Sequence, residues 1–85
     1  MMKPTIHFNG TSCKQLLTQA ERVCDTLRAA LVELADFTPD GRDYYPQGSD
    51  ATAQAGREHR TRVDRVRSVL VEIEELYVYL ADQEN

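Results

Sequence analysis

The chain has 85 residues, of which 41% are hydrophobic and 28% charged, and its formal net charge is −4. This composition is typical of one small globular domain and not of a disordered chain. A net negative charge argues against a DNA-coating role, so nucleic acid is not an expected partner. No apolar run approaches the roughly 18 residues of a membrane span, and no signal-peptide core is present. We therefore expect a cytoplasmic protein that does not contact a membrane.

The two cysteines indicate a protein whose thiols stay reduced. Cys13 and Cys24 lie eleven residues apart in a helical pattern, which separates them by roughly 16 Å along a helix axis. A disulfide needs Cα atoms within about 7 Å, so the two cannot bridge within one helix. No Cys/His spacing of a metal site is present, and no cofactor is expected.

The first ten residues predict an extended or irregular arm that leads into a helix. Ser12, followed three residues later by Gln15, fits the capping box, in which each side chain satisfies a backbone N–H of the other residue. Thr11 is the alternative N-cap. Phe8 precedes this start and is predicted to act as a hydrophobic staple on the following helix.

An apolar stripe predicts a first long helix over residues 13–37. Its members recur at steps of four and three: Leu16, Ala20, Val23, Leu27, Ala30, Leu34 and Phe37. A second row widens this stripe along one flank and contains Leu17, Cys24 and Leu31. Such a broad face is typical of a helix packed in a bundle. Pro39 ends the helix, because the residue before a proline is pushed out of the α region.

The connection over residues 38–49 contains two predicted turns, Pro39-Asp40-Gly41 and Pro46-Gln47-Gly48. In each turn the proline fixes φ at the first corner and the glycine takes the positive-φ position. A helix–helix connection usually has 2–8 residues, so about a dozen residues here call for a functional explanation.

A second long helix is predicted over residues 50–82, with Ser49 or Asp50 as its cap. Its stripe again steps by four and three: His59, Val63, Val66, Leu70, Ile73, Tyr77 and Leu80. The first half of this helix is rich in arginine, whereas the second half is acidic and also apolar on more than one face. One neighbouring helix covers only one face, so the sequence predicts an all-α antiparallel helical hairpin that assembles into a homo-oligomeric bundle, a dimer or larger.

The sequence contains none of the common catalytic motifs. A P-loop, a GxSxG elbow, an HExxH pair and an EF-hand loop are all missing, and both histidines are isolated. We therefore expect a protein that is not an enzyme.

One group of residues, on the connection and the opening turns of the second helix, predicts a ligand site. It contains Arg42, Tyr44, Tyr45, Gln47, Arg57, His59 and Arg60. A helix N-terminus offers free N–H groups, arginine binds phosphate bidentately, and tyrosine rings can stack on bases. In the alternative interpretation the tyrosines plug the end of the bundle and the arginines pair with nearby acids. His59 lies within the apolar stripe and fits a hydrogen-bonded position at the core edge.

The segments HFNGTS, GRDYYPQG and REHRTR resemble a group of small helical-hairpin proteins of tailed bacteriophages and prophages, whose role is unassigned. The similarity covers residues 6–80, and RDYYPQG is its most specific part. It implies a phage origin, the cytoplasm of a bacterial host and a helical hairpin.

These observations lead to two main hypotheses for the function. The first is that the protein sequesters a small phosphorylated nucleotide signal of bacterial immunity, by analogy with the small phage proteins, called sponges, that bind such signals. The arginines would hold phosphates, the tyrosines would stack on bases, and Gln47 would give selectivity. The alternative is an adaptor or inhibitor of a host protein that acts through the helix faces. A scaffold role in the phage particle is a third hypothesis.

Overall fold

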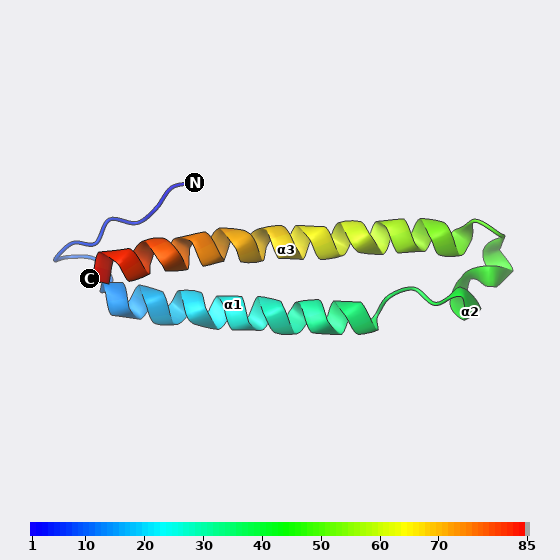
Figure 1. The fold of residues 1–85 in the computed structure, drawn as a ribbon, viewed down its shortest axis with the longest axis horizontal. Helices are drawn as coiled ribbons and strands as arrows, with labels where there is room; N and C mark the ends of the chain where they lie inside the picture. Colours follow the sequence, from blue (N-terminus) through cyan, green and yellow to red (C-terminus); the bar gives the residue numbers. More distant parts are fainter. Residues whose placement is uncertain (85) are drawn as a thin grey trace.

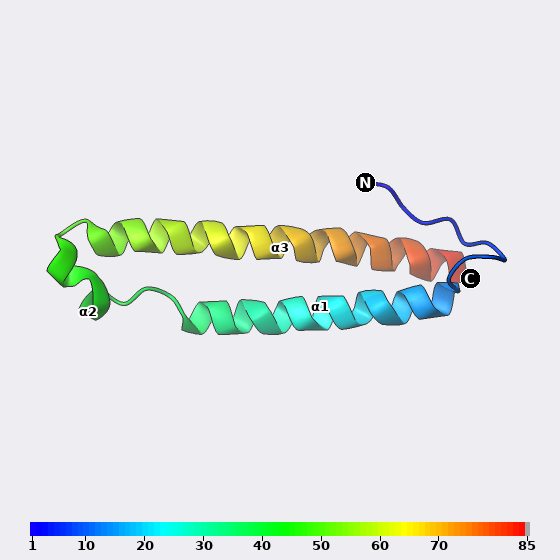
Figure 2. The same cartoon turned by 180° about the vertical axis from the view of Figure 1, so that it is seen from behind.

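Two long antiparallel helices make up most of the molecule. The computed structural model describes residues 1–84, which form α1 (Cys13–Asp36), the short α2 (Gly41–Tyr44), the 3-10 turn η1 (Tyr45–Gln47) and α3 (Ala51–Glu84). Figure 1 shows α1 and α3 side by side with α2 at one end, and Figure 2 shows the same arrangement from behind. The extents are 61 × 20 × 19 Å, so the molecule is a thin rod. The predicted helical architecture is confirmed, while its assembly with other copies stays a prediction.

The start of α1 follows half of the predicted capping box. The Ser12 Oγ accepts the backbone N–H of Gln15 at 3.1 Å, as expected of an N-cap. The Gln15 side chain, however, does not return to the Ser12 backbone; its Oε1 accepts the Ser12 hydroxyl at 3.3 Å. The other end of α1 is closed by Phe37, whose N–H donates to the carbonyls of Glu33 and Leu34 at 3.1 Å.

Replacing Ser12 with alanine should lower the free energy of unfolding by about 1 kcal/mol, because the Gln15 N–H loses its acceptor. Urea denaturation followed by circular dichroism measures this loss. Thr11→Ala is the matched control, since the neighbouring hydroxyl is not the cap. Equal losses in the two variants would contradict the assignment of Ser12.

The contact seam of α1 is rotated from the predicted stripe. Cys24 is buried, whereas Val23 is 43% exposed and Phe37 is 76% exposed. Five of the seven residues of the predicted stripe are half-buried, so the stripe borders the contact, but the exposure of Val23 and Phe37 shows that it is not the centre of the contact. The row that contains Leu17, Cys24 and Leu31 faces α3 more directly, and the row through Val23 lies on one flank of α1.

The hairpin has a thin core. In residues 1–84, the buried apolar side chains are Cys24, Leu70 and Leu80, and the buried polar side chain is His59. Two packed helices shield only a narrow strip from water, and a chain of this size already buries a modest fraction of its surface. Each of these side chains therefore carries a large share of the stability.

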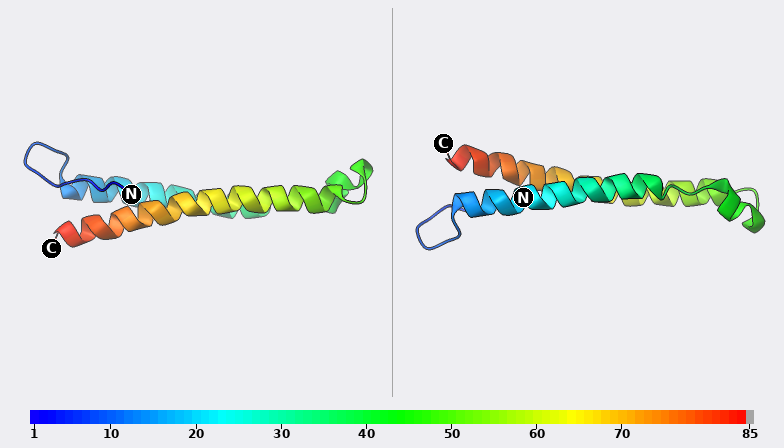
Figure 3. Two further views of the ribbon diagram at one scale, coloured as in Figure 1. Left: turned by 90° about the horizontal axis from the view of Figure 1, so that it is seen from above. Right: turned by 90° about the horizontal axis from the view of Figure 1, so that it is seen from below.

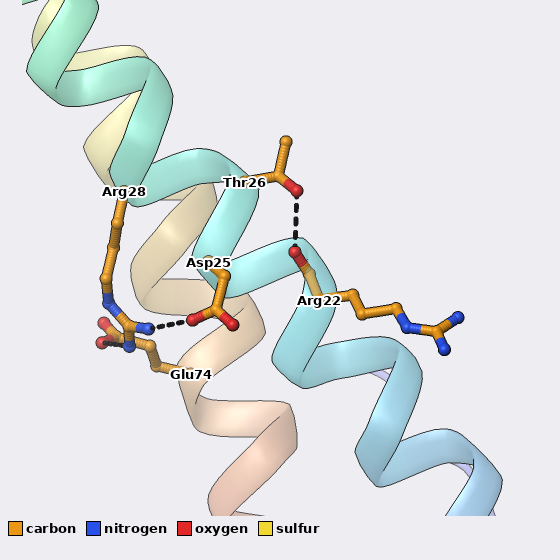
Figure 4. Close-up of polar contacts among 5 residues, drawn as sticks. All are labelled: Arg22, Asp25, Thr26, Arg28 and Glu74. Atoms are coloured by element: carbon orange, nitrogen blue, oxygen red, sulfur yellow. Dashed lines mark hydrogen bonds and ion pairs between the residues drawn. The ribbon is translucent and has the colours of Figure 1, made fainter.

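An arginine bridges the two helices on one side of the hairpin. The Arg28 guanidinium donates to Asp25 on α1 at 3.2 Å and to Glu74 on α3 at 3.0 Å (Figure 4). The hydrogen bond with Glu74 raises the pKa of Arg28, so the guanidinium is charged at every physiological pH. Arg28 and Asp25 are more than half exposed and Glu74 is 44% exposed, so water screens this bridge, and we expect it to orient the helices more than it stabilises them.

Both cysteines are free thiols, as the spacing predicted. The Cys13 thiol donates to the Leu80 carbonyl at 3.1 Å and so joins the start of α1 to the end of α3. Burial raises the pKa of the Cys24 thiol, which keeps this side chain protonated inside the hairpin.

The N-terminal arm folds back over α3. Figure 1 shows it turning away from the start of α1, and Figure 3 shows the same turn from above and below. The Tyr79 hydroxyl donates to the Pro4 carbonyl at 3.0 Å, and the Lys3 ammonium lies 5.5 Å from the centroid of the Tyr79 ring. Phe8 is 99% exposed, so its prediction as a hydrophobic staple is wrong. The arm packs through residues that the sequence did not single out.

Candidate functional site

The connection between the long helices is a short helix followed by a turn. Asp40 has an extended backbone and caps α2, because its carboxylate accepts the Arg42 N–H at 2.9 Å. Gly41 therefore begins a helix and does not take the predicted positive φ. Gly48 has φ 118°, which confirms the second predicted turn. The Arg42 backbone N–H, followed by its side chain, lowers the pKa of Asp40, which fixes a negative charge at this end of the hairpin.

Three of the predicted site residues line one open pocket of about 300 Å³ beside this connection. They are Arg42, Tyr44 and His59. The pocket also contains Arg62, which the sequence did not single out, and the carboxylates Asp36, Asp40 and Asp43. The Arg42 guanidinium is already paired with Asp40 at 3.4 Å. Three carboxylates against two guanidinium groups make the pocket less favourable to a phosphate than the arginines alone would be.

The remaining predicted residues do not join this pocket. Arg60 lines a different pocket, together with Val63 and Arg67. Arg60 is two residues before Arg62 of the first pocket, and two residues correspond to a rotation of about 200° around the axis of α3. Arg57 is exposed and lies six residues after the first residue of α3, about 9 Å from the helix N-terminus. The side chains of Tyr45 and Gln47 are exposed at the tip of the hairpin. The predicted constellation is thus divided between several sides of the molecule.

His59 has a structural environment. Its side chain is 4% exposed, and Nε2 lies 2.7 Å from the Leu34 carbonyl. A carbonyl can only accept, so Nε2 carries the hydrogen and donates it. The ring of Phe37 meets the imidazole edge-on, with ring centroids 6.2 Å apart. This geometry matches a hydrogen-bonded residue at the core edge, which ties α3 to the last turn of α1.

A second surface gathers on the C-terminal half of α3, and we call it the α3 patch. It consists of Val71, Glu74, Glu75, Val78, Tyr79 and Asp82, which line an open pocket of about 520 Å³ together with Lys3 of the arm. Val71 is 47% exposed and Val78 is 59% exposed. The sequence indicated an acidic and apolar surface here. It did not indicate that the chain's own lysine lies against it.

A comparison with protein-family models, with curated proteins and with solved structures finds no match. The similarity to phage hairpin proteins therefore stays a prediction from the motifs. In the part of the chain that the structure describes, no helix is both long and apolar enough to cross a membrane. Within the same residues, no three His, Cys, Asp or Glu side chains gather as a metal site.

Proposed function

We propose that the chain is a non-enzymatic protein-binding module, an adaptor or inhibitor, that holds a basic amphipathic segment of another protein on the α3 patch. The observation that carries this proposal is the pair of exposed valines between carboxylates. Val71 and Val78 are seven residues apart, two turns of α3, so they lie about 10 Å apart on one face. Glu74 and Glu75 lie between them, and Asp82 follows one turn beyond Val78.

The chain's own arm indicates which chemistry fits the patch. Lys3 lines the same pocket as Glu74, Glu75 and Asp82, with its ammonium over the Tyr79 ring. A partner segment with alternating apolar and basic side chains would satisfy the valines and the carboxylates together. An amphipathic helix laid against an apolar groove is a common mode of peptide recognition. The proposed partner is therefore basic and amphipathic.

Val78→Arg should reduce partner binding at least tenfold, because it places a cation where the partner's apolar side chain packs and repels its basic residues. The measurement compares proteins retained from bacterial lysate by the wild type, by Val78→Arg and by Tyr45→Ala. The last is the matched control, since Tyr45 is exposed at the opposite end of the hairpin. A protein retained by wild type and Tyr45→Ala but lost by Val78→Arg supports the proposal. Loss with Tyr45→Ala alone contradicts it.

Sequestration of a small phosphorylated nucleotide is the second candidate. It is supported by Arg42, Tyr44 and Arg62, which supply two guanidinium groups and a phenol around the loop pocket. Native mass spectrometry with a panel of cyclic and linear signalling nucleotides tests this candidate. A nucleotide bound in fixed ratio would favour it over the α3 patch, and a clean spectrum across the panel would leave the loop a structural connection.

A further inference from the structure

One side of the hairpin carries a row of mainly apolar side chains on each long helix, with one arginine in the α3 row, and we call this side the flank face. On α1 the row is Leu16, Val23, Ala30 and Phe37, and on α3 it is Arg62, Val69 and Leu76. Each row steps by seven residues, so its members stay on one side of their helix with a drift of about 20° per step. Phe37 and Arg62 line the same pocket, which places both rows on the same side of the hairpin.

The flank face is separate from the surfaces described above. Arg28 and Val78 line a pocket between the helices. Arg28 lies five residues after Val23, and Glu74, from the same pocket, lies five residues after Val69, so each is turned by about 140° around its helix from the flank row. The flank face is therefore free of the α3 patch and of the Arg28 bridge.

The apolar side chains of the flank face are poorly covered within one chain. Val23 and Val69 are 43% and 44% exposed, and Phe37 is more exposed still. Leu16 and Leu76 are half-buried. Large apolar side chains that both helices leave this exposed on one side of the hairpin are typical of an interface.

The charges of α3 suit a second copy of the same helix running in the opposite direction. Residues 57–67 contain five arginines against Glu58 and Asp64, whereas residues 68–84 contain five acidic residues and no basic one. Two α3 helices packed head to tail place each arginine-rich half beside an acidic half. If they cross at Val69, Arg65 of one copy meets Glu72 of the other, and this pair occurs twice.

The midpoints of the two flank rows lie at nearly the same height along the hairpin axis. Val69 is the centre of the α3 row, and the α1 row is centred between Val23 and Ala30, at Thr26 and Leu27. Cys13 of α1 contacts Leu80 of α3, and Leu34 of α1 contacts His59 of α3, so each step forward along α1 corresponds to one step back along α3. In this register Thr26 and Leu27 lie opposite residues 66–67 of α3. That level lies within one helical turn of Val69, so a single two-fold axis can relate both rows to their copies.

We propose that the flank face is the interface of a head-to-tail homodimer, a four-helix bundle in which α3 packs on α3, α1 packs on α1 and the two loops lie at opposite ends. The interface buries Val23, Phe37 and Val69, and it opposes the charged halves of α3. It does not depend on the proposed function, because it uses a different surface.

Two valine variants test the interface directly. Val69→Arg places two cations against each other at the symmetry axis and should weaken the dimer at least tenfold, as measured by native mass spectrometry over a dilution series. Val71→Arg is the matched control, because this valine has nearly the same exposure on another side of α3. A monomeric wild type, or equal dissociation of the two variants, would overturn the proposal. Retained helix content by circular dichroism confirms that the variants are folded.

Disulfide trapping tests the direction of packing. Val69→Cys should form a covalent dimer under mild oxidation, while Val71→Cys and the wild type should not. If the copies instead packed with their loops together, α1 would face α3 with Val23 at the level of Val69, and an equal mixture of Val23→Cys and Val69→Cys would give mainly the mixed disulfide. That result would overturn the head-to-tail arrangement. Val78→Arg should leave the dimer intact. Loss of partner binding therefore tests the α3 patch, and loss of the dimer tests the flank face, each without affecting the other.

Discussion

Replacing Leu70 with alanine should lower the free energy of unfolding by about 2–5 kcal/mol, the range for large-to-small changes in a core. Leu70 is buried near the middle of α3, where the two helices are in contact. The thin core offers few other side chains that could move in and fill the space. The loss is comparable to the whole stability that a core of this size supplies, so the variant should be largely unfolded at 37 °C. Urea denaturation at several protein concentrations measures it.

Val71→Ala is the control for this change. It removes apolar atoms from the neighbouring position, but its side chain is about half exposed and lies outside the contact seam. Its effect should stay within about 0.5 kcal/mol, as for other surface substitutions. If the two variants lost the same stability, the seam through Cys24 and Leu70 would not be the core of the hairpin.

Replacing His59 with alanine should lower the free energy of unfolding by about 2–4 kcal/mol, because it removes a buried ring and a buried hydrogen bond. The Leu34 carbonyl still accepts the Phe37 N–H at 3.1 Å, so it is not left without a partner. Most of the loss should therefore come from the space left beside Phe37. Calorimetry or urea denaturation gives the value.

Two further substitutions separate packing from hydrogen bonding at this position. His59→Leu refills the volume without a donor, whereas His59→Gln keeps an N–H donor on a flexible chain. Leucine should recover more stability than glutamine if packing dominates, as we expect. The reverse order would show that the bond to the Leu34 carbonyl matters more than the ring, and full stability of the alanine variant would contradict a structural role for His59.

The sequence predicts the helices well because their signals are local. Ser12 marks the start of α1, Pro39 follows its end, and the apolar steps of four and three run through both long helices. The position of the contact seam, in contrast, is not given by a local signal. The row through Leu16 and Val23 and the row through Leu17 and Cys24 have the same spacing, so only the position of α3 decides between them.

The candidate site was harder to predict because its residues share a segment of sequence but not a side of the structure. Arg60 and Arg62 are only two positions apart in the chain, yet they line different pockets on different sides of α3. Asp40 reads as a turn residue, yet it caps a short helix and pairs with Arg42. The contact of Lys3 with Tyr79 joins residues 76 positions apart, and no local pattern reports such a contact.

The antiparallel arrangement of α1 and α3 also gives the chain an order of folding. Beside the loop, His59 and Leu34 are 25 residues apart, whereas Cys13 and Leu80 at the other end are 67 residues apart. Closing the longer segment costs about 0.9 kcal/mol more chain entropy. We expect the first contacts to form beside the loop and to extend as a zipper towards the arm. The contact of Tyr79 with Pro4, 75 residues apart, then forms last.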